Sequence, residues 1–208
     1  MKNKDLKRRI IEISYKNKLS HLGSCLTASD IIEEIYSIKK PDEKFILSSG
    51  HAGVALYAVI EKHEGVGAEK IFKHHGVHPD RCTKCHLDCS TGSLGQGLPI
   101  AVGMALANRT KNVYCLISDG EATEGSIWEA LRIKNQEFLY NLKVYCNWNS
   151  YSAYSQTFMD INTDLKDKNV IVRYKNMDDY PKWLQGLEAH YAVVDSEDKY
   201  KELLEAVK

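Results

Sequence analysis

The chain has 208 residues, of which 43% are apolar and 27% charged, and its 28 basic side chains balance its 28 acidic ones. This length is enough to bury a hydrophobic core, and the composition is that of a folded globular protein. Zero net charge and the lack of any run of eighteen apolar residues give no reason to expect binding to nucleic acid or insertion into a membrane.

Apolar spacing and capping residues predict an alternation of helices and strands. The first part is predicted to contain helices over about 3–17 and 27–38, a strand at 45–47, and helices over about 51–63 and 67–74. An irregular stretch over about 75–95 follows, and loops of this length inside compact domains are usually functional. Next we expect a helix ending near 108, a strand at 112–117, a helix over 124–139 and a strand at 142–148.

The remaining segment is more polar. It is predicted to be irregular over 150–168, with a short strand at 170–172, a brief helix over 181–187, and a final amphipathic helix that Ser196 caps and that ends near Val207. Strands that alternate with helices predict an α/β fold, a parallel sheet covered by helices on both faces. We expect residues 1–208 to form a single domain.

Two polar sites follow the two strongest strand patterns. Ser118-Asp119-Gly120-Glu121 closes the run 113–117, and Asn149 closes the next strand thirty residues after Asp119. Ligands bind outside the carboxyl ends of such strands. The Asp119 carboxylate, the Asn149 amide oxygen and the Tyr151 carbonyl are oxygen donors of the kind that Mg2+ prefers, with diphosphate oxygens and water completing six. An Asp-Gly dipeptide alone marks a turn more often than a metal site.

Segments elsewhere in the chain add to this pattern. They are His21 with Gly23-Ser24, Leu47-Ser48-Ser49-Gly50-His51-Ala52, His78-Pro79, Thr91-Gly92-Ser93-Leu94-Gly95-Gln96-Gly97-Leu98, and Val102-Gly103-Met104-Ala105. In this order and spacing they resemble the diphosphate-binding (PP) domain of transketolase, a thiamine-diphosphate enzyme that moves two-carbon ketol units between sugar phosphates. The resemblance covers about 5–158, resumes near 186–207, and implies the thiamine-diphosphate-binding fold.

The resemblance also implies roles for individual residues. Asp119, Asn149 and the Tyr151 carbonyl would hold Mg2+ or Ca2+. The diphosphate would meet Gly120, the backbone of Glu121, and His51. Gly92 and Leu94 would offer backbone to the aminopyrimidine, which only a glycine lets approach so closely.

Four histidines match positions that surround the substrate hydroxyls in transketolases: His21, His51, His78 and His190. Histidine suits proton transfer because its pKa lies near neutrality. The other four, His63, His74, His75 and His86, are expected to be structural or surface residues. Glu124 and Glu129 match glutamates that the family places at a subunit interface, although exposed helices are rich in glutamate in any case.

The resemblance further implies a partner. Thiamine enzymes activate the cofactor with a glutamate on a pyrimidine-binding domain, which would require some two hundred residues or more beyond Lys208. We therefore expect a split enzyme whose C-terminal subunit supplies that domain in an α2β2 assembly acting on sugar phosphates. Relative to the family the C-terminal part, about 159–208, is shortened, and Arg173-Tyr174-Lys175-Asn176 replaces a Lys-Gly-Lys-Gly-like sequence. Donor and acceptor sugars stay open.

Two alternatives remain at this point. Another thiamine-diphosphate carboligase or decarboxylase, or a deoxyxylulose-phosphate synthase, would use the same metal site, but the string from Thr91 to Leu98 favours transketolase. A non-catalytic, cofactor-holding subunit would have no use for His21 and His78 in a substrate channel.

The sequence contains six cysteines. Cys115 and Cys146 lie in strand patterns, where a thiol behaves as a small apolar residue, so no disulfide framework is expected and the protein is predicted to be cytoplasmic. Cys82, Cys85 and Cys89 have a spacing that, with one imidazole, could hold a structural zinc ion. The alternatives are reduced loop thiols, or an iron–sulfur cluster, for which a fourth nearby cysteine is lacking.

Overall fold

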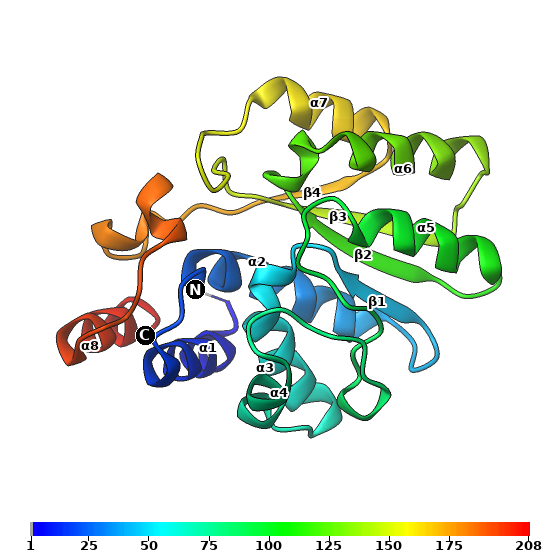
Figure 1. The fold of residues 1–208 in the computed structure, drawn as a ribbon. Coiled ribbons are helices and arrows are strands. Elements are labelled where there is room, and N and C mark those ends of the chain that lie inside the picture. The colour runs from blue at the N-terminus through cyan, green and yellow to red at the C-terminus, as the bar shows by residue number, and fades with distance from the viewer. Residues whose placement is uncertain (1) are drawn as a thin grey trace.

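A parallel four-stranded sheet forms the centre of the molecule (Figure 1), in a computed structural model that describes residues 2–208 apart from the side chain of residue 159. The strands lie side by side in the order of the sequence: β1 (Lys44–Leu47), β2 (Val113–Ser118), β3 (Leu142–Trp148) and β4 (Ile171–Tyr174). Each neighbouring pair is parallel. All four carboxyl ends therefore lie along one edge of the sheet.

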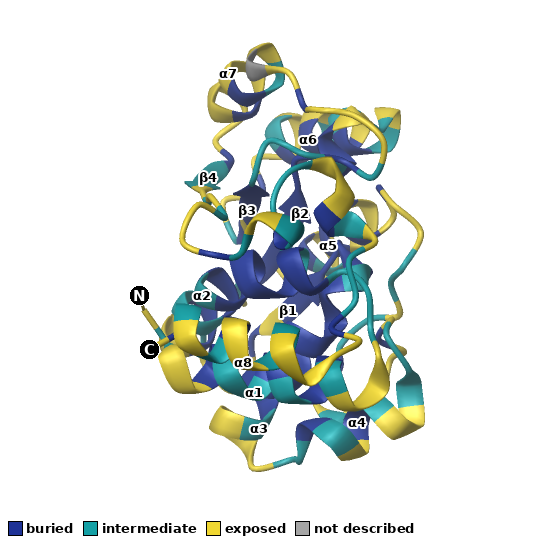
Figure 2. Ribbon diagram, turned by 90° about the vertical axis from the view of Figure 1, so that its left-hand side faces the viewer, coloured by how far each residue is buried: buried dark blue, intermediate teal, exposed yellow. Residues whose placement is uncertain are grey.

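Successive strand residues alternate between two apolar layers, as the pleat of a strand requires. On β2, Cys115 and Ile117 pack with α5 (Gly97–Ala107), α6 (Gly125–Gln136) and Leu165 of α7 (Met159–Asp167). Tyr114 and Leu116 face the other layer, which contains α1 (Lys4–Asn17), α2 (Leu22–Ile38), α3 (Gly53–Glu64), α4 (Ala68–His75) and α8 (Glu197–Ala206). The buried strands lie between the two sets of helices in Figure 2, which confirms the predicted α/β class.

The predictions differ most from the structure at three helices. Helix α2 begins at Leu22, five residues earlier than expected, because its buried first turn packs in the core behind His21, which has a φ of 61°. Helix α6 ends at Gln136 rather than near 139, and Phe138 adopts a left-handed φ of 50°. The prediction of an irregular segment over 150–168 was wrong in its second half, where α7 forms over a polar sequence that anchors Leu165 in the core.

The long loop between α4 and α5 is irregular apart from a short turn at Thr83–Cys85, as predicted. It folds back on itself, because Cys82 and Leu87 exchange two backbone hydrogen bonds of 2.9 Å and the Thr91 N–H donates to the Pro79 carbonyl at 3.0 Å. The fold of this loop places His78 and Gly92 side by side. Within residues 2–208, none of the helices is both long enough and apolar enough to cross a membrane.

Candidate active site

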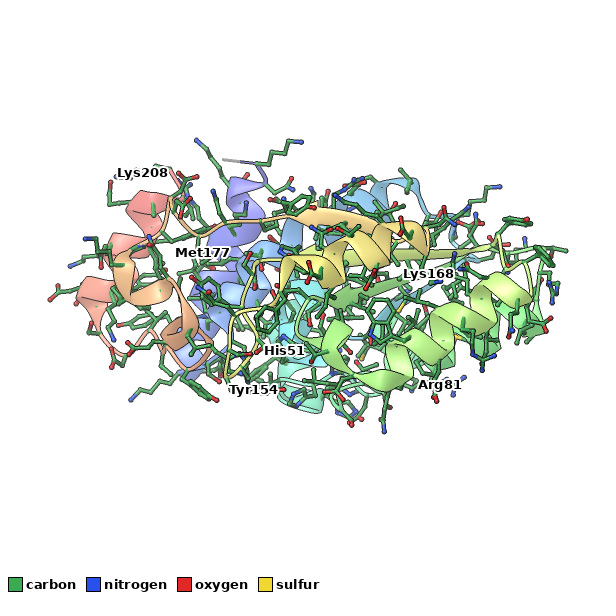
Figure 3. All side chains as sticks on the ribbon, turned by 90° about the horizontal axis from the view of Figure 1, so that it is seen from above. His51, Arg81, Tyr154, Lys168, Met177 and Lys208 are labelled. Atoms are coloured by element: carbon green, nitrogen blue, oxygen red, sulfur yellow. The ribbon has the colours of Figure 1, made fainter. Side chains whose placement is uncertain are left out.

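A pocket of about 200 Å³ opens at the carboxyl edge of the sheet. Its walls come from the loops that follow β1, β2 and β3, from the turn before α2, from the long loop and from the C-terminal segment. It is lined by all four predicted catalytic histidines, His21, His51, His78 and His190, and by the predicted cofactor residues Gly92, Leu94, Asp119, Gly120, Asn149 and Tyr151. Figure 3 shows His51 near Tyr154 at this edge, and both residues line the pocket.

Asp119 is the first residue after β2 and is only 1% exposed. Its Oδ2 accepts hydrogen bonds from the Ser150 N–H at 2.7 Å, the Thr157 hydroxyl at 3.0 Å and the Asn149 N–H at 3.2 Å. Burial raises the pKa of Asp119 to about 6, although these hydrogen bonds favour the charged form. The donors are neutral, and Asp119 makes no ion pair with any residue in the described part of the chain, so a cation in the pocket would stabilise it.

The neighbouring oxygens fit such a cation. Asn149 Oδ1 lies at the end of β3 and accepts the Tyr151 N–H at 3.0 Å. Asn147 Oδ1 is buried beside the pocket and finds no hydrogen-bond partner among residues 2–208. A carboxylate with amide and carbonyl oxygens is the donor set of a hard divalent ion such as Mg2+.

Gly120 leaves room for an anionic group next to these oxygens. A Cβ atom at Gly120 would lie 3.3 Å from Ser152 Cβ, so a larger residue would crowd the wall of the pocket. Gly92, which also lines the pocket, has a φ of 153°, and a Cβ there would lie 3.1 Å from the His78 ring. Both glycines therefore let backbone line the pocket directly, as a bound diphosphate or heterocycle requires.

Three of the histidines form one cluster. The ring centroids of His21 and His190 are 4.5 Å apart, those of His21 and His51 are 5.4 Å apart, and the backbone N–H of His21 donates to the His190 carbonyl at 3.2 Å. Burial lowers the pKa of His21 to about 4 and that of His51 to about 3, and the neighbouring histidines lower both further. Burial also lowers the pKa of His190. Neutral rings each offer one donor and one acceptor, the pattern that binds hydroxyl groups.

Glu121 does not line the pocket, although we predicted that its backbone would meet the phosphates. Its side chain is fully buried, and Oε1 accepts hydrogen bonds from the Ser48 hydroxyl at 2.7 Å and the Gly95 N–H at 2.9 Å. Burial raises the pKa of Glu121 to about 7. The carboxylate thus joins the segments that follow β1 and β2 to the loop that precedes α5.

The remaining predicted residues lie outside the pocket. Glu124 is half-buried at the start of α6, and Glu129 is exposed on the same helix. Cys82 and Cys85 lie near His75 and not near Cys89, which packs against the opposite apolar layer, so the predicted trio of cysteines is not brought together.

Eight further residues line the pocket. Four of them stand in the motifs quoted above, although no role was assigned to them: Ser24, Ser49, Ala52 and Ser118. The other four were not predicted: Asn147, Ser152, Ala153 and Tyr154. Asn147 is the penultimate residue of β3, so a search that included the last residues of each strand would have found it. Ser152 and Tyr154 lie in a polar segment without periodicity, which gave no signal.

The chain matches the family model described as "Transketolase, thiamine diphosphate binding domain" over residues 16–180. It is 32% identical over 196 residues to a transketolase from Pongo abelii, an alignment that covers 84% of this chain and 29% of that protein. It is 33% identical over 157 residues to one of the subunits of an apulose-4-phosphate transketolase from Phocaeicola vulgatus, covering 65% of this chain and 55% of that protein.

Solved structures show the same fold at lower identity. The transketolase from Leishmania mexicana superposes with a TM-score of 0.70 at 18% identity, covering 96% of this chain and 40% of that one. A transketolase from Pichia stipitis gives a TM-score of 0.68 at 19% identity, with coverage of 96% and 39%. The chain therefore spans well under two thirds of the length of each protein that it matches here.

Proposed function

The chain belongs to the transketolase family of thiamine-diphosphate-binding domains, and from this premise we propose that it is the diphosphate-binding component of a two-component transketolase. Such an enzyme transfers a two-carbon ketol unit between sugar phosphates. The observation that supports this most strongly is the pocket that gathers Asp119 and Asn149 with the histidines at 21, 51, 78 and 190. A cofactor-holding domain without chemistry has no need of four imidazoles around one pocket.

In this proposal the end of the sheet anchors the cofactor. Asp119, Asn149 and the Tyr151 carbonyl hold Mg2+ or Ca2+, and the backbone at Gly120 lies against the diphosphate. The bound thiamine diphosphate supplies the nucleophilic carbon that the reaction needs. Gly92 and Leu94 line the same pocket, where a flat ring would lie against their backbone.

The histidines act on the sugar. Burial keeps His21 and His51 neutral at pH 7, so each ring offers one N–H donor and one acceptor nitrogen to the hydroxyl groups of the sugar. His190 touches His21 edge to face and fixes the orientation of that ring. His78 is exposed at the mouth of the pocket, where it can reach a substrate that enters from solvent.

A partner chain is part of the proposal, and helix α5 supports it. Its solvent side is apolar at helical spacing, with Ile100 39% and Leu106 38% exposed and Gly103 between them. A docked subunit would bury these side chains. The Phocaeicola vulgatus relative is named as one subunit of a transketolase. We propose that a C-terminal subunit carrying the pyrimidine domain docks here in an α2β2 assembly, near Glu124 and Glu129 of the adjacent α6.

The compartment is part of the proposal as well. All six cysteines are free thiols, which supports a reducing, cytoplasmic setting.

Native mass spectrometry of the chain, tagged and purified from its own cells without chelators, tests the proposal. We expect a second polypeptide in equal number, together with thiamine diphosphate and Mg2+. Isolation of a lone chain or homodimer without cofactor would refute the proposed function.

Two variants of the assembled enzyme test the site itself. Asp119→Ala should abolish Mg2+-dependent binding of thiamine diphosphate, whereas His78→Ala should preserve binding and lower turnover by about 10²–10⁴-fold. Asp164→Ala, at an exposed position of α7, and His63→Ala, outside the pocket, are the matched controls. Normal cofactor binding by Asp119→Ala would overturn the site assignment.

A further inference from the structure

A second cluster of ligating side chains lies outside the pocket, at the start of the long loop. One ring nitrogen of His75 and the sulfur atoms of Cys82 and Cys85 all lie within 4.8 Å of one another. Tetrahedral zinc, with Zn–S near 2.3 Å and Zn–N near 2.0–2.1 Å, needs its ligand atoms about 3.8 Å apart. We propose that His75, Cys82 and Cys85 form a zinc site that fastens this loop to helix α4.

The backbone holds the two thiols together without help from an ion. The Cys85 N–H donates to the Cys82 carbonyl at 3.1 Å, and Cys82 and Leu87 close the turn with two hydrogen bonds of 2.9 Å. His86 completes the reversal with a left-handed φ of 55°.

His75 supplies an independent sign of a missing partner. It is the last residue of α4, so its backbone is fixed by the helix. Its Nε2 is buried and has no hydrogen-bond partner within residues 2–208, an arrangement that costs free energy unless an ion or water satisfies the nitrogen.

The donor set selects the metal. Two thiolates and an imidazole suit Zn2+ and are poor ligands for Mg2+, the ion that suits the oxygens of the pocket. Cys89 takes no part, because its thiol donates to the Ser90 carbonyl at 3.3 Å and packs against the other apolar layer. Three protein ligands leave the fourth tetrahedral position to a water molecule.

A zinc ion at this position would also stiffen the loop that carries His78 and Gly92. His78 lies three residues after the ligand His75. The Thr91–Pro79 hydrogen bond pairs the start of the loop with its end, and the turn that contains Cys82 connects these two stretches. An ion at this point would hold both stretches, which carry His78 and Gly92 to the pocket, without touching the pocket itself. The zinc site does not depend on the proposed transketolase function.

The first test uses the full-length chain, purified without chelator, and measures zinc by inductively coupled plasma mass spectrometry. We expect about one zinc ion per chain. Cys82→Ser, Cys85→Ser and His75→Gln should each lose it, while the matched controls Cys89→Ser and His74→Gln should keep it. Zinc loss in Cys89→Ser equal to that in Cys85→Ser, or a wild-type chain that carries no zinc and binds none on titration, would overturn the proposal.

X-ray absorption at the zinc edge of the wild-type chain needs no variant and so does not depend on their folding. Two sulfur neighbours near 2.3 Å with one imidazole nitrogen near 2.0–2.1 Å are the expected first shell. A shell with three sulfur atoms, or one with only oxygen and nitrogen as an adventitious ion would give, contradicts the assignment.

Discussion

The Ser48 hydroxyl donates a 2.7 Å hydrogen bond to the Glu121 carboxylate, so two side chains 73 residues apart join the ends of β1 and β2 beside the pocket. The same carboxylate accepts the N–H groups of Gly95 and Ser118. A single buried group thus sets the spacing of three segments that form the pocket.

Replacing this carboxylate by an amide should destabilise the fold. In Glu121→Gln the amide nitrogen must face either the donors at Gly95 and Ser48 or the Ser118 N–H, which leaves at least one buried donor unsatisfied. We expect the free energy of unfolding, measured by urea denaturation, to fall by about 1–3 kcal/mol. Glu129→Gln, at an exposed position of α6, should change it by less than about 0.5 kcal/mol. Equal effects in both variants would rule out the structural role of Glu121.

Stability should depend on pH through His51. Its folded-state pKa of about 3 lies below the ordinary 6.5, so between these values the unfolded chain binds a proton that the folded chain does not. Titration of His51 therefore leaves the free energy of unfolding unchanged above about pH 6.5. Below that pH it lowers the free energy of unfolding as the pH falls, by at most about 1.4 kcal/mol per pH unit. His51→Gln should flatten the profile of unfolding free energy between about pH 4.5 and 6.5 in urea denaturation.

The quantity to compare is the difference in unfolding free energy between His51→Gln and the wild type at each pH. Asp119 and Glu121, whose pKa values burial raises, contribute a slope of opposite sign that cancels in that difference. A His51→Gln profile parallel to that of the wild type would show that the ring is not held neutral.

Replacing either of two glycines by alanine should change the stability of the fold, in opposite directions at the two positions. A Cβ at Gly50 would lie 2.7 Å from the backbone nitrogen of Gly92, so Gly50→Ala must displace the long loop and should cost about 1–3 kcal/mol. A Cβ at Gly103, inside α5, would have no described atom within 4 Å. Gly103→Ala should therefore stabilise the fold by about 0.5–1 kcal/mol. Thermal unfolding of the two variants measures both, and the same sign for both would contradict the packing described.

A charge on the apolar face of α5 should weaken partner binding and leave the fold intact. Ile100→Asp is expected to reduce the affinity of the proposed two-chain complex at least about 10-fold, as judged by native mass spectrometry over a concentration series. Phe138→Asp is the control, since Phe138 is 67% exposed and follows α6 rather than lying on α5. An undiminished complex in Ile100→Asp would exclude this face as the docking site.

Most of the fold could be predicted from the apolar patterns of the strands. Runs of apolar residues located the strands to within a residue or two, and their order gave the α/β class. Helix α7 escaped because its sequence is polar, and what stabilises it is burial of Leu165 against the sheet, a tertiary contact. The early start of α2 was missed for a similar reason, since its first turn is held by burial of Leu22, Gly23 and Cys25, which is a tertiary contact.

The site was predictable where it follows strand ends. Asp119 and Asn149 could be placed because parallel strands end at one edge. The contact of Asn147 with Thr27 of α2, a 2.9 Å hydrogen bond, could not, because it depends on how a helix packs across the sheet. The pairing of Cys82 and Cys85 with His75 instead of Cys89 depends on a chain reversal at Leu87 that cysteine spacing does not reveal.

The contact between His21 and His190 bears on how the protein is made. During synthesis from the N-terminus, a nascent chain that has reached Tyr151 already carries the oxygens for a cation, yet the ring that packs on His21 is still some forty residues from being translated. Contacts so distant in sequence form late in folding. In the proposed function, the anchoring half of the pocket would therefore be complete in the folding chain before the half that positions the substrate.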